Sequence, residues 1–177
     1  MSSLTFLGAS GGAGTTTLAA LSVLLLVEQG SRIPTVVAEN PTAFDGRLGP
    51  LPSPVRGNGH ELIDGGRYRE GKVAAAIEQG RLVLVGASTP QGIIALDTAL
   101  ADVAQRFGAA GVERTVPVLC SSFGRSPAVT GRLCIPFDAR LVPGAPLTTS
   151  LPLLRAQTKN TLQMQWLPVV RDVYGSH

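Results

Sequence analysis

The sequence predicts an α/β protein built on a mainly parallel sheet with helices on both faces, a three-layer sandwich. Short apolar runs alternate with longer segments whose apolar residues recur every three or four positions, as in a parallel sheet with crossover helices. Hydrophobic residues make up 44% of the chain and charged residues 15%, which excludes a disordered chain. With 177 residues and no internal repeat, we expect one domain over residues 1–177.

The first elements of the chain are a strand, a helix and a second strand. The apolar residues 4–7 predict the first strand, which passes through a glycine-rich turn into an apolar helix over residues 16–29. Gly30 ends that helix, because glycine readily adopts the conformation that closes a helix. Residues 34–38 predict the second strand, and the Gly- and Pro-rich residues 41–59 predict a long loop.

The middle of the chain continues the alternation. Residues 60–63 predict a weak strand and residues 73–78 a short helix. The continuous apolar run at 82–87 is typical of a strand that is covered on both faces. Apolar side chains at spacings of three and four predict a helix over 90–107 that ends at Gly108.

The last third of the chain predicts two strands and a helix. The strands cover residues 115–122 and 132–136. The helix begins near Ser150 and Pro152, which suit the N-cap and the first helical position. Pro168 predicts a break or kink in its later course, because proline lacks the backbone N–H that the helix needs.

The net charge of +3 permits an anionic partner without indicating one. Thirteen of the 15 basic residues are arginines, a bias that favours a bacterial source with GC-rich DNA. The only lysines, Lys72 and Lys159, are both distant in sequence from the glycine-rich turn. Any phosphate bound at that turn must therefore be held by backbone N–H groups, hydroxyls or arginine.

Cys120 and Cys134 lie in apolar runs, where reduced thiols and a cytoplasmic location are expected. The longest apolar run, residues 18–27, is about half of a membrane span, and no secretory signal precedes it. His60 and His177 have no Cys or His neighbours at ligand spacing, so we expect no transition-metal site.

The glycine-rich turn contains the strongest functional signal. Gly11, Gly12 and Gly14 allow the backbone to curl so that successive N–H groups point inward, and the start of the helix adds partial positive charge. Thr16 stands where a phosphate-binding loop places its Mg²⁺-binding hydroxyl. The alternative is that the glycines form only a tight strand-to-helix turn.

The loop resembles a known phosphate-binding motif. Residues Ser10-Gly11-Gly12-Ala13-Gly14-Thr15-Thr16-Thr17 are similar to the deviant Walker A loop of the ParA/MinD-type P-loop ATPases, which reads Lys-Gly-Gly-Val-Gly-Lys-Thr-Thr. Both lysines of that motif are replaced here, by Ser10 and Thr15. The resemblance implies a P-loop NTPase-like fold.

Other stretches resemble the same family in the same order. Residues 36–41 resemble its Asp-x-Asp-Pro segment, with Ala38 and Asn40 at the acidic positions, and residues 61–67 resemble its Walker B strand, with the acid at Asp64. Residues 135–141 resemble its Ile-Pro-Tyr-Asp segment, which implies that Pro136 and Asp138 lie beside a nucleotide base. The match covers nearly the whole chain, which is similar to a shortened, degenerate member of the family.

The departures from the motif predict that ATP is not hydrolysed at a meaningful rate, so no residue is assigned a catalytic role. Positioning and charge stabilisation are almost the whole mechanism of phosphoryl transfer. In the family, the resemblance implies, the lysine at position 10 acts across a nucleotide-sandwich dimer, and the acid at position 38 orients the attacking water. Ser10 and Ala38 can do neither.

Weak binding of ATP or ADP with Mg²⁺ remains compatible with the sequence. Thr16 and Asp64 are the expected Mg²⁺ residues if a nucleotide binds. Arg67 follows the acid by three residues, and it either replaces part of the missing charge or is a solvated arginine in a polar turn. The candidate phosphate-binding residues are Ser10, Gly11, Gly12, Ala13, Gly14, Thr15, Thr16, Thr17 and Arg67.

Three functions stay open at this point. The first is a pseudo-ATPase that acts as a binding or scaffold subunit in positioning, partition or assembly, with a protein partner or a second copy of itself. The second is a working ATPase that uses Arg67 in place of the lysines. The third is an α/β interaction module that binds no nucleotide.

DNA and membranes are the other partners to weigh. A loose basic group, Arg67, Arg69, Lys72 and Arg81, touches DNA or an acidic partner, or is ordinary solvated surface. No aromatic residues are interleaved with it, which weakens the DNA interpretation. The C-terminal segment around Trp166 lacks a basic face, so we expect it to pack on the core and not on a membrane.

Overall fold

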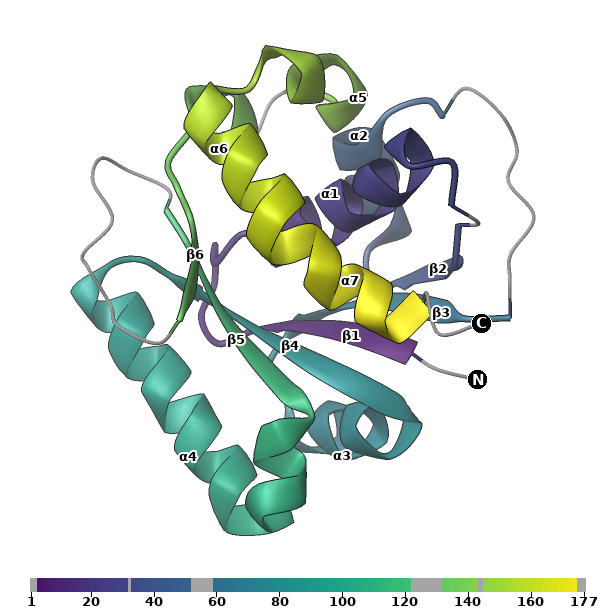
Figure 1. The fold of residues 1–177 in the computed structure, drawn as a ribbon. Coiled ribbons are helices and arrows are strands. Elements are labelled where there is room, and N and C mark those ends of the chain that lie inside the picture. Colours follow the sequence, from purple (N-terminus) through teal and green to yellow (C-terminus); the bar gives the residue numbers. More distant parts are fainter. Residues whose placement is uncertain (1–2, 32, 52–58, 122–131, 143–144, 175–177) are drawn as a thin grey trace.

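The computed structural model describes residues 3–31, 33–51, 59–121, 132–142 and 145–174. Six strands form one sheet in the order β2-β3-β1-β4-β5-β6, and every pair of neighbours is parallel (Figure 1). The predicted parallel sheet is confirmed. The strands are β1 (Ser3–Gly8), β2 (Thr35–Ala38), β3 (Glu61–Arg67), β4 (Gly80–Ala87), β5 (Thr115–Cys120) and β6 (Leu133–Ile135).

Helices cover both faces of the sheet (Figure 1). One face is covered by α3 (Glu70–Gln79) and α4 (Pro90–Glu113), which pack on alternate side chains of the central strands. The opposite face is covered by α1 (Thr15–Glu28), α2 (Pro41–Leu48), α5 (Leu147–Ser150), α6 (Ala156–Thr161) and α7 (Leu167–Tyr174). Side chains alternate along each strand, so each central strand contributes to both cores.

Helix α1 lies at the centre of the larger core, which explains why its sequence is apolar on nearly all sides. The C-terminal segment packs on it: Trp166 is fully buried, donates from Nε1 to Ser22 Oγ at 3.0 Å, and meets the Phe6 ring edge-on. The expectation that this segment packs on the core is therefore confirmed. Among the described residues, no helix is long and apolar enough to cross a membrane.

The structure differs from the prediction in residues 41–59, which the sequence predicted to be a loop. Helix α2 occupies its first part, with Asn40 as the N-cap that accepts from Ala43 N at 3.1 Å and Pro41 at the first helical position. Asn followed by Pro is a helix-start signal that the sequence analysis passed over. Residues 52–58 of the predicted loop lie outside the described residues.

Two other helix boundaries also differ. Gly108 interrupts α4 with φ 61°, as expected of the predicted end, but a further helical turn follows it. Pro152 lies in a 3₁₀ turn, Leu151–Leu153, and the long C-terminal helix begins only at Ala156. Near Pro168 the helix does not break; a π-helical turn, Leu162–Trp166, precedes α7.

The topology places the glycine loop where a ligand is expected. From β1 the chain moves to one side for β2 and β3 and to the other side for β4, β5 and β6. The loop between β1 and α1 therefore lies at the carboxyl edge of the sheet, where the strand order reverses, and parallel sheets bind ligands there.

Candidate functional site

The glycine loop joins β1 directly to the first turn of α1. Gly12 has φ 72° and Gly14 has φ 88°, a left-handed conformation that favours glycine over other residues. No side chain caps the start of α1, and no acidic residue lies in its first turn. The first N–H groups of the helix and its positive dipole end are therefore available to an anion.

The two positions that lack lysine carry short hydroxyl side chains. Thr15 Oγ1 lies against Gly8 at the base of the loop, only 2.6 Å from where a Cβ on that glycine would stand. Ser10 lines the loop on its open side. Neither side chain brings positive charge to the loop.

Thr16 and Asp64 lie together, one from the first turn of α1 and the other from β3. The Thr16 hydroxyl lies close enough to the Asp64 carboxylate to favour its charged form, and Gly66 N donates to Asp64 Oδ1 at 3.4 Å. Asp64 is 3% exposed, and this burial raises the pKa of its carboxyl, although the nearby Thr16 hydroxyl opposes the shift. A hydroxyl beside a carboxylate is a donor set that Mg²⁺ accepts together with water and phosphate oxygens.

Arg67 reaches the loop from the end of β3. The position that a Cβ on Gly11 would take lies 2.9 Å from the Arg67 Nη2 atom, so the guanidinium lies directly against the loop backbone. The next residue, Tyr68, is held by its backbone and by its side chain. Tyr68 N donates to Gly8 O at 2.9 Å, and Tyr68 Oη donates to Asp102 on α4 at 2.5 Å. The chain that carries Arg67 is thereby tied to β1 and to α4.

Glu39 is a site residue that the sequence analysis missed. It follows Ala38 at the end of β2, and its carboxylate lies over Gly66, where it occupies the space that a Cβ would need. A hydrogen bond from Lys72 at 2.9 Å lowers the pKa of the Glu39 carboxyl. The family pattern directed attention to positions 38 and 40, and Asn40 instead caps α2.

Lys72 also comes close to the site, although it is distant from the loop in sequence. Its ammonium group donates to Gly65 O at 2.6 Å as well as pairing with Glu39. These contacts hold it on the α3 side of β3, where it lines a cavity beside Asp64 and not the cavity over the glycine loop. It does not stand in for the lysine that the loop lacks.

Two cavities share the glycine loop. The first, of about 740 Å³, lies over the open side of the loop, and Glu39, Asp64 and Arg67 are among its polar residues. The second, of about 650 Å³, lies on the side of β5 and β6 and is lined largely by apolar residues such as Leu21 and Ile135. Ser10, Gly11, Gly12, Gly14 and Thr17 line both cavities.

Pro136 and Asp138 both lie on the second cavity. The Asp138 carboxylate is 2% exposed and accepts from Arg140 N at 3.1 Å and from Arg155 N at 2.8 Å. Although burial opposes the shift, these backbone bonds together lower the pKa of that carboxyl. Its oxygens are engaged in holding the chain, so the apolar wall is the part that remains to contact a base.

The basic group proposed from the sequence is not one patch. Arg81 lies at the start of β4, at the opposite edge of the sheet from Arg67, and pairs with Asp172 at 2.7 Å. Lys72 is engaged with Glu39 at 2.9 Å, whereas Arg67 and Arg69 line the cavity over the loop, Arg69 also within 4.0 Å of the Glu39 carboxylate. Among the described residues, no cluster of three or more His, Cys, Asp or Glu side chains could hold a metal ion.

Solved structures share this fold. The chain is similar to a ParA family ATPase from Chlorobium tepidum TLS, with a TM-score of 0.60 and 14% identity over 97% of this chain and 96% of that one. It is also similar to a chain of the MinC:MinD cell division protein complex of Aquifex aeolicus, with a TM-score of 0.65 and 12% identity over 100% and 97%. The fold is therefore that of the ParA/MinD-type P-loop ATPases. No family model matches the sequence, and no curated protein does.

Proposed function

We propose that this protein is a pseudo-ATPase that binds ATP or ADP weakly, hydrolyses neither at a meaningful rate, and acts as a binding or scaffold subunit. The observation that supports this most is the pair of Ser10 and Thr15 on a loop that keeps its glycine geometry. Such a loop retains the N–H groups that hold phosphates and lacks the cations that stabilise phosphoryl transfer.

The missing charge is large enough to matter. One lysine about 4 Å from a phosphate charge contributes on the order of 4 kcal/mol of gross attraction at an effective dielectric of about 20. Phosphoryl transfer depends almost entirely on positioning and charge stabilisation, so losing two such cations reduces catalysis more than binding. Ala38 adds to the deficit, because no carboxylate stands at its position to orient a water molecule.

Binding would use groups that the chain retains. The N–H groups of residues 11–17 and the hydroxyl of Thr17 would hold the phosphates, and Thr16 and Asp64 would hold Mg²⁺. Bound Mg²⁺ supplies positive charge that offsets the phosphates. The apolar wall of the second cavity, including Pro136 and Leu141, would receive the base.

The scaffold role rests on likeness to proteins that work in assemblies. One similar structure is a complex of MinC with MinD, described as a cell division protein complex. By analogy we propose a protein partner or a second copy of this chain, and a role in positioning, partition or assembly of cellular machinery.

One observation favours a second candidate function, an active ATPase. The Arg67 guanidinium lies against Gly11, where it would meet the outermost phosphate of a bound nucleotide. An arginine supplied in this way stabilises the transition state in related phosphoryl-transfer enzymes. Arg67 would then replace part of the charge of the missing lysines.

Calorimetric titration with Mg-ADP and Mg-ATP tests the proposal. We expect both nucleotides to bind with dissociation constants below about 1 mM, the affinity of a few weak contacts. The Gly14→Ala variant, which distorts the loop, is the control and should show no heat of binding. Absence of binding to the wild type at millimolar nucleotide would contradict the proposal and favour an interaction module without nucleotide.

A further inference from the structure

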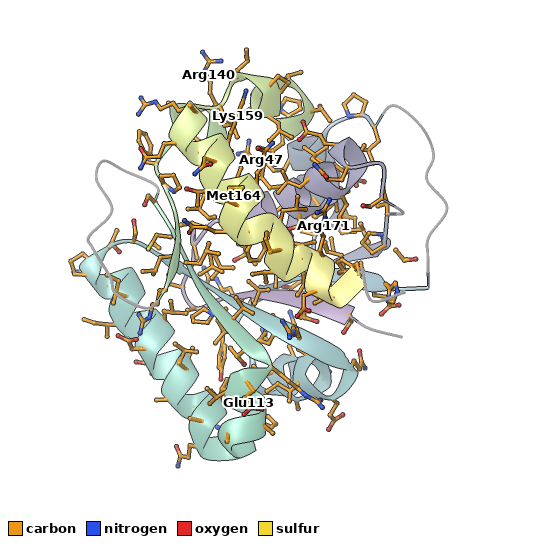
Figure 2. The ribbon with its side chains drawn as sticks, in the orientation of Figure 1. Arg47, Glu113, Arg140, Lys159, Met164 and Arg171 are labelled. Carbon is orange, nitrogen blue, oxygen red and sulfur yellow. The ribbon has the colours of Figure 1, made fainter. Side chains whose placement is uncertain are left out.

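Arg47 is a buried cation that plays no part in the site described above. It lies in the last turn of α2 and is 8% exposed (Figure 2). Burial lowers the pKa of its guanidinium. Arginine is almost never fully buried unless it is paired, because removing its charge from water is costly.

All the partners of Arg47 are neutral. Its Nε donates to Thr17 Oγ1 at 3.0 Å, its Nη1 to Ala145 O at 2.7 Å and its Nη2 to Leu141 O at 2.5 Å. These bonds engage each of the three guanidinium nitrogens with a neutral oxygen, so none of them compensates the charge.

No carboxylate pairs with Arg47. The chain has 12 Asp and Glu residues, and each of them lies in the part of the chain that the structure describes. None of the ion pairs among the described residues includes Arg47. A buried guanidinium with no acidic side chain beside it can be compensated by an anion that binds from outside.

The hydroxyl of Thr17 connects this charge to the ligand cavities. Thr17 Oγ1 accepts from Arg47, so the hydroxyl hydrogen must point elsewhere, and within the described residues it meets no acceptor. Thr17 lines both cavities that share the glycine loop. An oxygen that accepts from a cation is also a stronger donor, because hydrogen bonds in a chain polarise one another.

We propose that Arg47 is a positioning residue that acts through Thr17, turning its hydroxyl toward a phosphate oxygen and supplying positive charge from behind the loop. The ligand is an anion of the phosphate-ester or pyrophosphate class. The inference rests on the proposed nucleotide binding for the identity of that ligand. It adds Arg47, which contacts Thr17, to Arg67, which lies against Gly11, as a source of charge.

The local packing indicates why Arg47 can reach Thr17. Helix α2 ends at Gly49, with φ 84°, where a Cβ would collide with Pro146 and Thr148. The glycine therefore lets α2 pack closely on the segment whose carbonyl groups hold the guanidinium. Leu141, which supplies one carbonyl, also walls the second cavity, so Arg47 joins the loop to that wall.

The test compares an anionic ligand with a neutral one. The wild type, Arg47→Met and Thr17→Val are titrated with ADP, adenosine and inorganic pyrophosphate, with folding checked by circular dichroism. We expect Arg47→Met to weaken ADP and pyrophosphate about tenfold and adenosine by less than about twofold, as for loss of one charge-assisted hydrogen bond. Arg171→Met removes an exposed arginine that bonds Gln29 and is the matched control, with all affinities unchanged.

Further outcomes separate the inference from its alternatives. Thr17→Val should reproduce the anion-specific loss, and the double variant should lose less than the sum of the two single losses, because the two residues are coupled. Thr17→Val also tests the inference if Arg47→Met fails to fold. Equal losses for ADP and adenosine, or no loss for either, would overturn it and leave Arg47 a structural tie. If the wild type binds pyrophosphate and not ADP, the proposed nucleotide function fails and pyrophosphate alone decides the role of Arg47; binding of neither overturns both.

Discussion

The two cavities that share the glycine loop differ in how they are built. The second cavity is walled by core residues from α1, β5 and β6, so its shape follows from the packing that holds the fold together. The first cavity is bounded by the loop, the end of β2 and the end of β3, and its character depends on a few polar side chains. A change of three or four surface residues can therefore alter the chemistry of the first cavity while the second persists.

This difference explains how the phosphate-binding geometry of the loop can be retained after the catalytic residues are lost. The curl of the loop needs only glycines at the left-handed positions and the start of α1. The reaction needs cations and an acid, and the positions that carry them in the motif hold Ser10, Thr15 and Ala38 here. Backbone geometry and side-chain charge are separate requirements, and this chain satisfies the first.

Removing the curl should have the largest effect, because it affects both cavities. Gly14→Ala forces a non-glycine residue to φ 88°, and we expect nucleotide affinity to fall on the order of 100-fold, as for a misplacement of about 1 Å. Gly30→Ala is the control, since Gly30 has φ 66°, with nothing within 4 Å of the added Cβ, at the far end of α1. Urea unfolding should give about 1–2 kcal/mol of destabilisation for each variant, with binding lost only for Gly14→Ala.

Restoring a cation should strengthen phosphate binding in the first cavity and leave binding in the second cavity unchanged. Thr15→Lys places an ammonium group at the position that carries lysine in the deviant Walker A motif, and we expect ADP to bind about tenfold more tightly after desolvation is subtracted. Titration of ADP and adenosine should show the gain for ADP only. Thr98→Lys adds the same charge on the exposed side of α4 and should change neither affinity. A folded Thr15→Lys variant with no gain would count against a surviving cradle.

Removing Arg67 should have a smaller effect, because its side chain is exposed to solvent. We expect Arg67→Ala to weaken ATP by about threefold to fivefold, and ADP less, since the guanidinium lies against Gly11 at the outer end of the loop. Arg69→Ala removes a neighbouring exposed arginine and should change the ratio of the two affinities less. Equal affinities of the wild type and Arg67→Ala for ATP would show that Arg67 is a solvated turn residue.

The smallest effect concerns the pH dependence of stability. Burial raises the pKa of the Asp64 carboxyl above its ordinary value of 3.8. Between these two pKa values, the folded protein therefore holds the carboxyl proton more tightly than the unfolded chain does. As pH rises from about 3.8 through the raised pKa, the wild type should lose stability relative to Asp64→Asn, and the difference should then level off. Urea unfolding of both proteins across this range measures it. A difference independent of pH would contradict the burial of a charged Asp64.

The order of elements could be predicted from the sequence because apolar runs and helical spacing report burial directly. Helix α2 could not, since its apolar pattern is short and the Gly and Pro residues around it resemble a loop; only the Asn40-Pro41 cap indicated it. The π turn before Pro168 was not predicted either, since the residues 162–166 carry no local signal that separates it from an α-helix.

The site was partly predictable for a related reason. The positions of the loop glycines, Thr16 and Asp64 follow from the local sequence and from the order of the strands. Both can be read from the pattern of apolar and glycine residues. Glu39, Lys72 and Arg47 reach the site through contacts between segments far apart in the chain, and nothing in their immediate sequence marks them. Burial of an arginine with no acidic partner becomes visible only once the fold is known.

The most direct test of the central claim is a phosphate-release assay under single-turnover conditions, with protein in excess over Mg-ATP. A pseudo-ATPase should bind ATP without releasing phosphate above the rate measured in buffer alone. Release by the wild type that Thr16→Ala or Asp64→Asn abolishes would contradict it, because the activity would then belong to this site and the protein would be a working ATPase.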